Sequence, residues 1–281
     1  DITEDKKTII HIFNSKHYLD KKKVENLPIG LFGDFYSHEL SFSLINNNDY
    51  KNLNIIFEKC NLKIKKILLK SFVEGSHIIN NNKFKDNFFQ IKINKNDSQL
   101  FYFENESLKY EQNFDFGSDI VIKDISQVTS LKIDIVKKIL NNINFKQNTI
   151  KDELIEKELF QGENYIKIKK KLLFDIAKAR IEELLDLIII TNINLLSFNK
   201  NNNAIFFKIN DKMHLKYFEE IYKSILYEHN YLKFKFIENI STEDLINNAN
   251  KIVHYGWKKE AIPVTHAKKS IIAKFFEALF G

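Results

Sequence analysis

The sequence predicts an α/β fold with a sizeable hydrophobic core. Short β-branched and aromatic segments alternate along the chain with segments in which apolar residues recur at helical spacing. Hydrophobic residues make up 44% of the 281 residues and include 25 Phe, a composition that excludes a disordered chain. A chain of this length holds one large domain or two ordinary ones, and no internal repeat of fixed period occurs.

The N-terminal part is predicted to be a small α+β unit. Residues 8–14 and 39–45 have the composition and partial alternation of strands, and residues 28–33 form a turn-rich connector between them. Residues 49–60 predict a helix, and residues 63–69 predict another strand. The residues at helical spacing in this helix are Leu53, Ile56, Phe57 and Cys60.

A meander of strands is predicted next. Residues 88–93 and 99–103 form two strands joined by the turn from Asn94 to Ser98, and a third strand is expected at residues 107–114.

Helices dominate the middle of the chain. They are predicted at residues 117–127, 131–142 and 151–159, and the strongest helical pattern covers residues 168–190. The apolar face expected for this last helix comprises Leu172, Ile176, Ala179, Leu184, Leu187 and Ile188.

The globular part is expected to end with two further strand–helix pairs. Residues 204–209 predict a buried strand and residues 232–237 a second strand, with helices at residues 214–228 and 242–253.

The C-terminal segment, residues 268–281, predicts a short amphipathic helix that follows a linker at residues 254–267. Either this helix packs on its own domain, or it lies in a membrane interface with its apolar face inserted. Its place behind a linker and its large apolar face favour the membrane. The candidate membrane-binding residues are Lys268, Lys269, Ile271, Ile272, Phe275, Phe276, Leu279 and Phe280.

The charged residues argue against nucleic acid as a partner. The formal net charge is +6, from 43 Lys+Arg and 37 Asp+Glu, and Arg180 is the single arginine. Bidentate recognition of phosphates and base edges favours Arg over Lys. The mild positive excess permits contact with an anionic surface, and no apolar run of about 18 residues spans a membrane.

No motif in the sequence points to catalysis or to a metal site. The eight His are scattered without the paired spacing of a zinc site, and Cys60 stands alone. Neither a nucleophile elbow nor a phosphate-binding GxxxxGK[ST] occurs. The chain starts at Asp1 with a polar, turn-like stretch, which indicates a fragment.

Several segments, in order along nearly the whole chain, resemble the FtsA family of actin-like bacterial cell-division proteins. TIIHIFNSKHYLD, LPIGLFG and ELSFSLIN resemble a family stretch that reads roughly H-V-I-P-Q-E-Y-x-x-D, then P-x-G-x-x-G, then a valine-rich strand. NLNIIFEKCNLKIKKILLKSFVEGSHII resembles the next helix, strand and P-x-A-S-A segment of the family. FGSD with IVIKDIS, and KKKLLFDIAKARIEELLDLI, resemble later segments, and the linker and final helix match the membrane-targeting end of the family.

The nucleotide-binding loops of the family are degenerate here. Actin-like ATPases hold phosphate in a strand–turn–strand hairpin, but the family's D-I-G-G-G-T-T-D falls on residues 92–99, where no glycine remains. The later T-G-G-G falls on residues 208–211, again without glycine. ATP and Mg²⁺ are the cofactors of the family, and we expect weak or lost binding and no enzyme activity. The other interpretation of the first turn is an ordinary hairpin loop. The degenerate loop residues are Asn94, Lys95, Asn96, Asp97, Ser98, Asn210 and Asp211, with Gly117 nearby in the sequence.

The resemblance implies an actin-like, ribonuclease-H-like ATPase fold that is N-terminally incomplete. Residues 1–72 would be part of an SHS2-type α+β subdomain, and residues 73–253 the second half of the actin-like core, with 128–170 as its upper lobe. Residues 254–281 would be the linker and the membrane-targeting helix.

The implied function is to anchor FtsZ filaments to the cytoplasmic face of the bacterial inner membrane at the division site, and to help assemble the divisome at the septum. The expected partners are the FtsZ C-terminal peptide, inner-membrane lipids, further copies of the chain in filaments, and other divisome proteins. A lysine run in the upper lobe is the candidate FtsZ contact, or else a solvated helix start: Lys167, Lys169, Lys170 and Lys171. The alternatives are an active ATPase or kinase-like enzyme of the same superfold, or a basic nucleic-acid-binding module.

Overall fold

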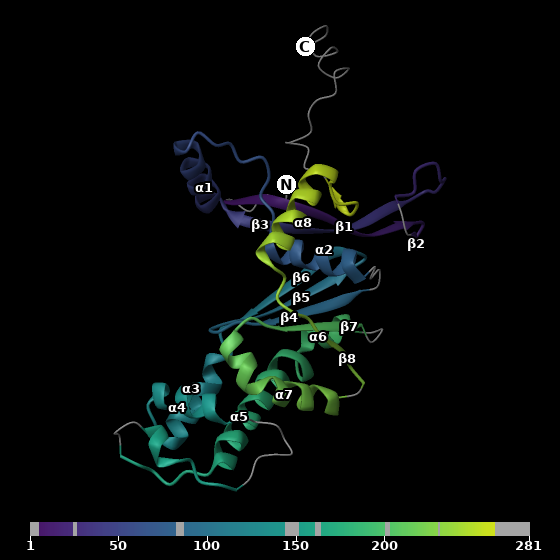
Figure 1. Ribbon diagram of the computed structural model, residues 1–281. Coiled ribbons are helices and arrows are strands. Elements are labelled where there is room, and N and C mark those ends of the chain that lie inside the picture. Colours follow the sequence, from purple (N-terminus) through teal and green to yellow (C-terminus); the bar gives the residue numbers. More distant parts are fainter. Residues whose placement is uncertain are drawn as a thin grey trace. The chain divides into compact units, whose positions relative to one another are not determined.

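The structure is a computed structural model, and Figure 1 shows its helices and strands. The residues that it describes are 6–24, 27–82, 87–143, 152–160, 164–199, 203–229 and 231–261. The chain divides into two compact units. Unit 1 comprises residues 1–86, 104–109 and 240–281, and unit 2 comprises residues 87–103 and 110–239. The predicted division at residues 72 and 253 stays a prediction.

A five-stranded sheet forms the centre of unit 2. Its strands are β4 (Phe88–Ile93), β5 (Ser98–Glu104), β6 (Ser107–Phe114), β7 (Ala204–Ile209) and β8 (Lys233–Phe236). They lie in the order β6-β5-β4-β7-β8; β5 is antiparallel to β4, whereas β7 is parallel to both β4 and β8. This mixed sheet, with its antiparallel strands first and its parallel strands after the helices, is the ribonuclease-H-like sheet of actin-like proteins. The predicted actin-like α/β fold is confirmed, whereas the incomplete N-terminus, the SHS2-type subdomain and the C-terminal amphipathic helix stay predictions.

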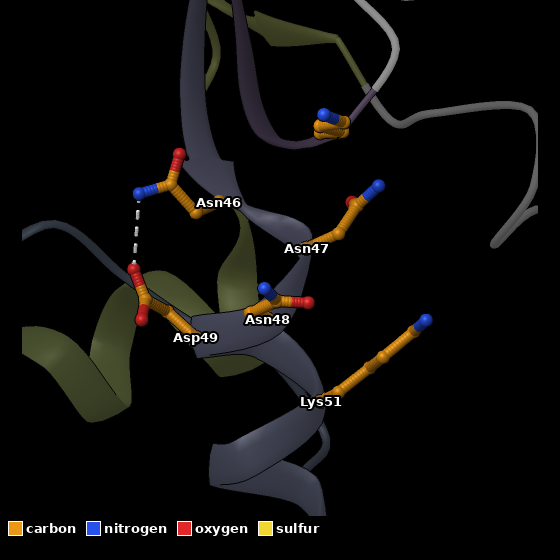
Figure 2. Close-up of a pocket in the computed structure, with 6 residues that line it drawn as sticks. Asn46, Asn47, Asn48, Asp49 and Lys51 are labelled. Atoms are coloured by element: carbon orange, nitrogen blue, oxygen red, sulfur yellow. Dashed lines mark hydrogen bonds between the residues drawn. The ribbon is translucent and has the colours of Figure 1, made fainter.

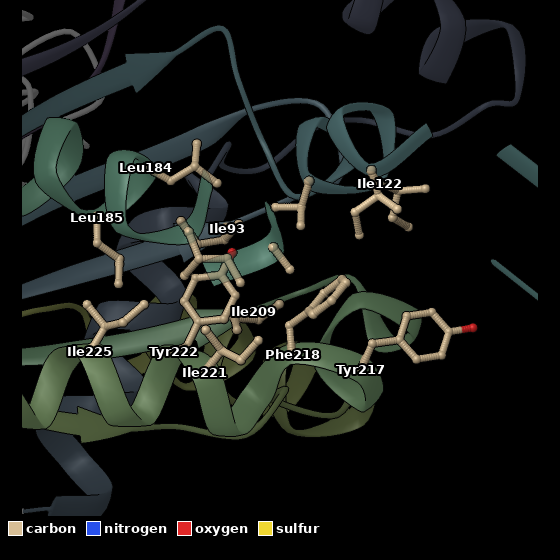
Figure 3. Close-up of a cluster of buried hydrophobic side chains, with 14 of the residues drawn as sticks. Ile93, Ile122, Leu184, Leu185, Ile209, Tyr217, Phe218, Ile221, Tyr222 and Ile225 are labelled. Carbon is tan, nitrogen blue, oxygen red and sulfur yellow. The ribbon is translucent and has the colours of Figure 1, made fainter. Parts of the chain in front are cut away.

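Three helices cover one face of this sheet (Figure 3). They are α3 (Asp119–Thr129), α5 (Lys170–Leu185) and α7 (Lys212–Glu228), and a π-helical turn (Asp186–Ile190) extends α5. The core continues over α4 (Ile133–Asn142), a 3₁₀ turn (Lys157–Phe160) and α6 (Ile193–Phe198). In the core, Ile93 and Ile209 from the two central strands pack with Phe218 and Tyr222 of α7.

The buried face of α5 differs from the predicted one. Leu172, Ala179 and Leu187 of the expected face are exposed, whereas Leu184 and Ile188 are buried as expected. The buried side also includes Leu173, Ala177, Ile181, Leu185 and Ile189. Apolar residues occupy more than one side of this helix, so a spacing of three and four residues fits two faces.

Unit 1 contains a second sheet around the long strand β1 (Lys7–Leu19). One edge of β1 pairs with β3 (Tyr36–Asn46), and β1 also pairs with β2 (Lys22–Val24) and β9 (Glu260–Ala261). Burial alternates along β1, as expected of a strand with one covered face. Phe13 on the covered face packs against Phe72, with 4.7 Å between the ring centroids.

Within its described residues, unit 1 contains three helices: α1 (Asn47–Lys59), α2 (Lys70–Asn82) and α8 (Thr242–Tyr255). The helices α2 and α8 pack together, and the Asn248 side chain of α8 donates hydrogen bonds to the Val73 carbonyl and the Ser76 hydroxyl of α2, at 2.8 and 2.7 Å. In contrast, α1 has no buried residue, so its predicted apolar positions remain at the surface of the described structure.

The strand predicted at residues 63–69 is wrong. This segment has no strand assignment and leads directly into α2, which sequence reasoning missed. Alternating and branched side chains are local features, and a strand also needs a neighbouring strand to pair with. The segment is held instead through Lys66 and Leu69.

These two residues contact a buried His–Glu pair. The Leu69 amide donates to Nε2 of His11 at 3.1 Å, so the ring proton lies on Nδ1, which donates to Glu260 at 2.7 Å. The Lys66 ammonium donates to the other oxygen of Glu260 at 2.8 Å. Burial raises the pKa of Glu260, but the hydrogen bonds from His11 and Lys66 outweigh it and leave the pKa below its ordinary value.

The linker predicted from residue 254 does not begin there. Gly256, at φ +75°, ends α8, and the Trp257 indole then donates to the Glu106 carbonyl at 2.8 Å. The Asn14 amide donates to the Lys259 carbonyl at 2.7 Å, next to the pairing of β9 with β1. Residues up to 261 therefore belong to the folded part.

Candidate functional site

The degenerate loop residues meet at the carboxyl ends of β4 and β7. These strands are parallel neighbours, and Ile93 lies opposite Ile209 in register, so the turn after β4 and the turn after β7 are adjacent. In open α/β sheets this edge is where ligands usually bind. The structure thus brings together the two turns that the sequence analysis named separately as degenerate loops.

A compact polar network joins the two turns, and we call it the hairpin cluster: Asn94, Asp97, Ser118, Asn210 and Asp211. The side-chain amide of Asn210 donates to Oδ1 of Asn94 at 2.6 Å, and the side-chain amide of Asn94 donates to the Asp97 carboxylate at 2.8 Å. The Ser118 hydroxyl donates to Oδ2 of Asp211 at 2.9 Å. These side chains use one another as partners.

Gly117 lets the turn after β4 lie directly on the start of α3. The Ser118 amide donates to the Asn94 carbonyl and the Asp119 amide donates to the Lys95 carbonyl, both at 2.9 Å. A Cβ on Gly117 would lie 2.4 Å from the Asn94 oxygen and 2.7 Å from the Lys95 carbonyl carbon. The glycine is required because backbone approaches backbone here.

This arrangement does not fit the phosphates of a nucleotide. Phosphate binds at helix N-termini through unpaired backbone amides. At α3 two such amides bond to the carbonyls of the turn, and at α7 the Asp211 carboxylate accepts from the Met213 and His214 amides, both at 3.1 Å. The side chains that face the turns include the carboxylates of Asp97 and Asp211, which repel an anion.

The described part of the chain also has no group of three or more His, Cys, Asp or Glu placed to hold a metal ion. Both carboxylates of the hairpin cluster already accept protein hydrogen bonds.

His214, which the sequence analysis did not single out, lies buried beneath the hairpin cluster. It is in the first turn of α7, and its Nε2 lies 3.0 Å from the Tyr222 hydroxyl, while its Nδ1 is buried without a hydrogen-bond partner. Burial lowers the pKa of His214 to about 4, although Asp211 and Asp119 act to raise it. The same burial raises the pKa of the Tyr222 hydroxyl. At neutral pH His214 is therefore uncharged. In the sequence, only the position of His214, three residues after the helix-capping Asp211, could have pointed to it.

The lysine run at residues 167–171 contains two kinds of side chain. Lys169 pairs with Asp152 at 2.7 Å, and Lys170 pairs with Glu156 at 2.9 Å and more loosely with Glu153. The hydrogen bond to Glu156 raises the pKa of Lys170 above its ordinary value.

Lys167 and Lys171 are exposed and have no ion pair within the described residues. The four lysines are therefore not one uniform basic patch, and two of them serve to hold the strand bridge between Leu154 and Lys169.

The tail residues Lys268, Lys269, Ile271, Ile272, Phe275, Phe276, Leu279 and Phe280 lie outside the described residues. No helix in the described ranges is long and apolar enough to cross a bilayer.

Figure 2 shows an open polar hollow where β3 joins α1. Its cavity volume is about 500 Å³, and amides and lysines line it: Lys6, Asn46, Asn47, Asn48, Asp49 and Lys51. Within it Asn46 donates to the Asp49 carboxylate at 3.2 Å. None of these residues was singled out from the sequence, and the hollow lacks a nucleophile or an acid–base pair.

Comparison with known proteins supports the FtsA resemblance. No family model matches the chain. The cell division protein FtsA of Buchnera aphidicola subsp. Schizaphis graminum (strain Sg) is 22% identical over 184 residues, which cover 64% of this chain and 44% of that protein. The chain thus matches less than half the length of this curated relative. The similarity to FtsA expected from the sequence is confirmed.

Solved structures with a similar course of the chain include two of actin-like type. The PilM–PilN type IV pilus biogenesis complex matches with a TM-score of 0.49 and 5% identity over 90% of this chain and 66% of that one. MreB5 of Spiroplasma citri bound to ADP matches with a TM-score of 0.48 and 13% identity over 76% of this chain and 67% of that one. Because both TM-scores are below 0.5, the fold class rests on strand order and direction.

Proposed function

We propose that this actin-fold chain, similar to FtsA, is a cell-division adaptor that anchors FtsZ filaments to the cytoplasmic face of the inner membrane. The observation that carries the proposal is the similarity to FtsA over 184 residues, in a chain whose central sheet has the actin-like strand order. Self-association into filaments and contacts with other divisome proteins at the septum are parts of the same proposal.

The membrane part of the proposal rests on the sequence of residues 268–281. Phe275→Glu together with Phe276→Glu places two charges in the apolar face, and we expect it to release the full chain from anionic liposomes in a flotation assay. The matched control is Lys274→Glu, which makes the same change of two units in net charge on the polar face and should weaken binding much less. If the Phe variant still floats with liposomes, or if its core melts much earlier, the tail is a packed terminal element.

The FtsZ part of the proposal assigns an acidic peptide partner to the exposed lysines of the upper lobe. Lys167→Glu with Lys171→Glu should weaken capture of an FtsZ C-terminal peptide by roughly fivefold or more at low salt, because two attractive charges become repulsive. This variant leaves the ion pairs of Lys169 and Lys170 intact, so stability should not change. Unchanged peptide affinity at low salt would remove this surface from the FtsZ site.

The proposal also states that the chain does not hydrolyse ATP. The hairpin cluster supports this, because its amides and carboxylates bond to one another. Isothermal titration with MgATP should detect no binding in the micromolar range. Tight, magnesium-dependent binding would instead favour the alternative, an active ATPase or kinase-like enzyme of the same superfold.

A further inference from the structure

The loop between β2 and β3 presents large apolar side chains to solvent. Ile29 is 83% exposed and Phe32 is fully exposed. The loop that carries them projects beyond the strand ends in Figure 1. Leu27, Leu31 and Phe35 are also more than half exposed. We call residues 27–35 the apolar tip. So many large apolar side chains in one short loop are unusual for a surface that only meets water.

The base of the apolar tip is fixed to the end of the β1–β2 hairpin. One oxygen of the Asp20 carboxylate accepts from the Asp34 and Phe35 amides, both at 2.9 Å, and the Asp20 amide donates to the Phe35 carbonyl at 2.8 Å. Gly33 lies so close to Leu19 that an added Cβ would be 2.5 Å from its side chain. These contacts fix residues 33–35, the end of the apolar tip that leads into β3.

Three consecutive lysines lie beside the apolar tip. Lys21, Lys22 and Lys23 directly follow Asp20, the residue that binds the base of the tip, and all three are exposed. Within the described residues none of the three has an ion pair. Positive charge and exposed apolar surface therefore occur together at one end of the sheet.

We propose that the apolar tip and Lys21 to Lys23 form a membrane contact that inserts into an anionic lipid surface, independently of the C-terminal segment. Apolar side chains at a convex tip suit insertion between lipid headgroups, and neighbouring lysines suit the anionic headgroups themselves. The occupant is argued from charge: among residues 20–24 and 27–35 the three lysines exceed the two exposed carboxylates, Asp20 and Asp34, and this positive excess favours an anionic lipid surface. The contact adds a second attachment point to the proposed adaptor but does not require it to bind FtsZ.

The first test separates this contact from the tail in the full chain. Ile29→Ser with Phe32→Ser is compared with wild type in two backgrounds, the native tail and Phe275→Glu with Phe276→Glu. We expect the tip variant to lower partition onto phosphatidylglycerol-containing vesicles by about tenfold in both backgrounds. If the tail variant alone abolishes binding and the tip variant changes nothing in either background, the tip contact is overturned while the tail proposal stands.

The lysines are tested by Lys21→Gln, Lys22→Gln and Lys23→Gln together. Lysines near an anionic leaflet are attracted to its headgroups, so we expect at least a tenfold loss on anionic vesicles and little change on phosphatidylcholine. Binding that depends on neither the lysines nor the lipid charge would overturn the assignment to anionic lipid.

The second test reports insertion directly at the tip. Cys60, the single cysteine, is replaced by Ser, and a polarity-sensitive dye is attached to Ile29→Cys or, as a matched exposed control, to Asn48→Cys. Anionic vesicles should shift the emission to the blue at position 29 and not at position 48. An unshifted dye at position 29 on protein that floats with vesicles would overturn the proposal. So would a fall in the sedimentation coefficient of Ile29→Ser with Phe32→Ser without lipid, because it would assign the tip to contacts between copies.

Discussion

Two turns of this chain, the β4–β5 turn at the hairpin cluster and the apolar tip of unit 1, use their residues in opposite ways. In the hairpin cluster the polar groups bond to one another and Gly117 brings backbone against backbone. In the apolar tip the backbone at the base is held by Asp20, but the side chains contact little of the chain. The comparison contrasts a turn whose polar groups satisfy one another with a turn whose apolar side chains face solvent.

The largest effect is expected from Gly117→Ala. The new Cβ would overlap the backbone of Asn94 and Lys95. This backbone cannot move without breaking the hydrogen bonds that it accepts from the amides at the start of α3. We therefore expect a loss of about 3 kcal/mol or more in unfolding free energy. The matched control is Gly30→Ala in the apolar tip, where φ is +80° and no atom lies within 4 Å of the new Cβ. It should cost only about 1 kcal/mol of backbone strain. Urea denaturation of both variants checks the difference, and equal losses would show that the two turns are equally constrained.

Acid should weaken unit 2 through His214. Because its pKa falls from 6.5 to about 4 on folding, the unfolded chain takes up the proton more readily. The stabilising effect of neutral His214 is full above pH 6.5 and is lost as the pH falls towards 4, by about 3 kcal/mol at most.

The check is the difference in unfolding free energy between wild type and His214→Phe from pH 7.5 to 4. This difference cancels the carboxylates that titrate in both proteins. A pH-independent difference would contradict the assignment of the slope to His214.

A smaller effect is expected from removing the helix cap in the hairpin cluster. Asp211→Ala takes away the acceptor of the Met213 and His214 amides, and should cost about 1–2 kcal/mol in thermal or urea unfolding. Asp34→Ala, in the apolar tip, keeps the backbone amide that Asp20 binds and should change stability by less than about 0.5 kcal/mol. Similar losses of stability in the two variants would contradict the contrast between the internally bonded turns of the hairpin cluster and the solvent-exposed apolar tip.

The smallest effect on stability is expected from the tip itself. Ile29→Ser with Phe32→Ser removes exposed side chains, so the unfolding free energy should stay within about 0.5 kcal/mol of wild type. Differential scanning fluorimetry is sufficient to measure this. A clear drop in the melting temperature would show that these side chains pack against the chain in solution.

The fold was largely predictable because the central strands are bounded by clear turns and are followed by amphipathic helices. The alignment with the family's loops singled out both turns of the hairpin cluster, the site where Asn94 meets Asn210. The internal bonding of that site was not predictable, because the spacing of residues does not reveal which amide meets which carbonyl.

The errors have a common physical origin. Residues 63–69 and the face of α5 were assigned from local periodicity, but pairing and burial depend on segments distant in the sequence. The same limit applies to the apolar tip, which was predicted only as a turn. Pro28 and Gly30 mark a turn, but they say nothing about whether Ile29 and Phe32 find a partner.

The pairing of β9 with β1 has a mechanical consequence. Any tension on the chain beyond Ala261 reaches Glu260 first, whose carboxylate is held on two sides by His11 and Lys66. The load then passes sideways into β1, which shares it with β2 and β3. Strain therefore spreads over a whole sheet before it unwinds α8, and unit 1 resists pulling at that point better than a helix end alone would.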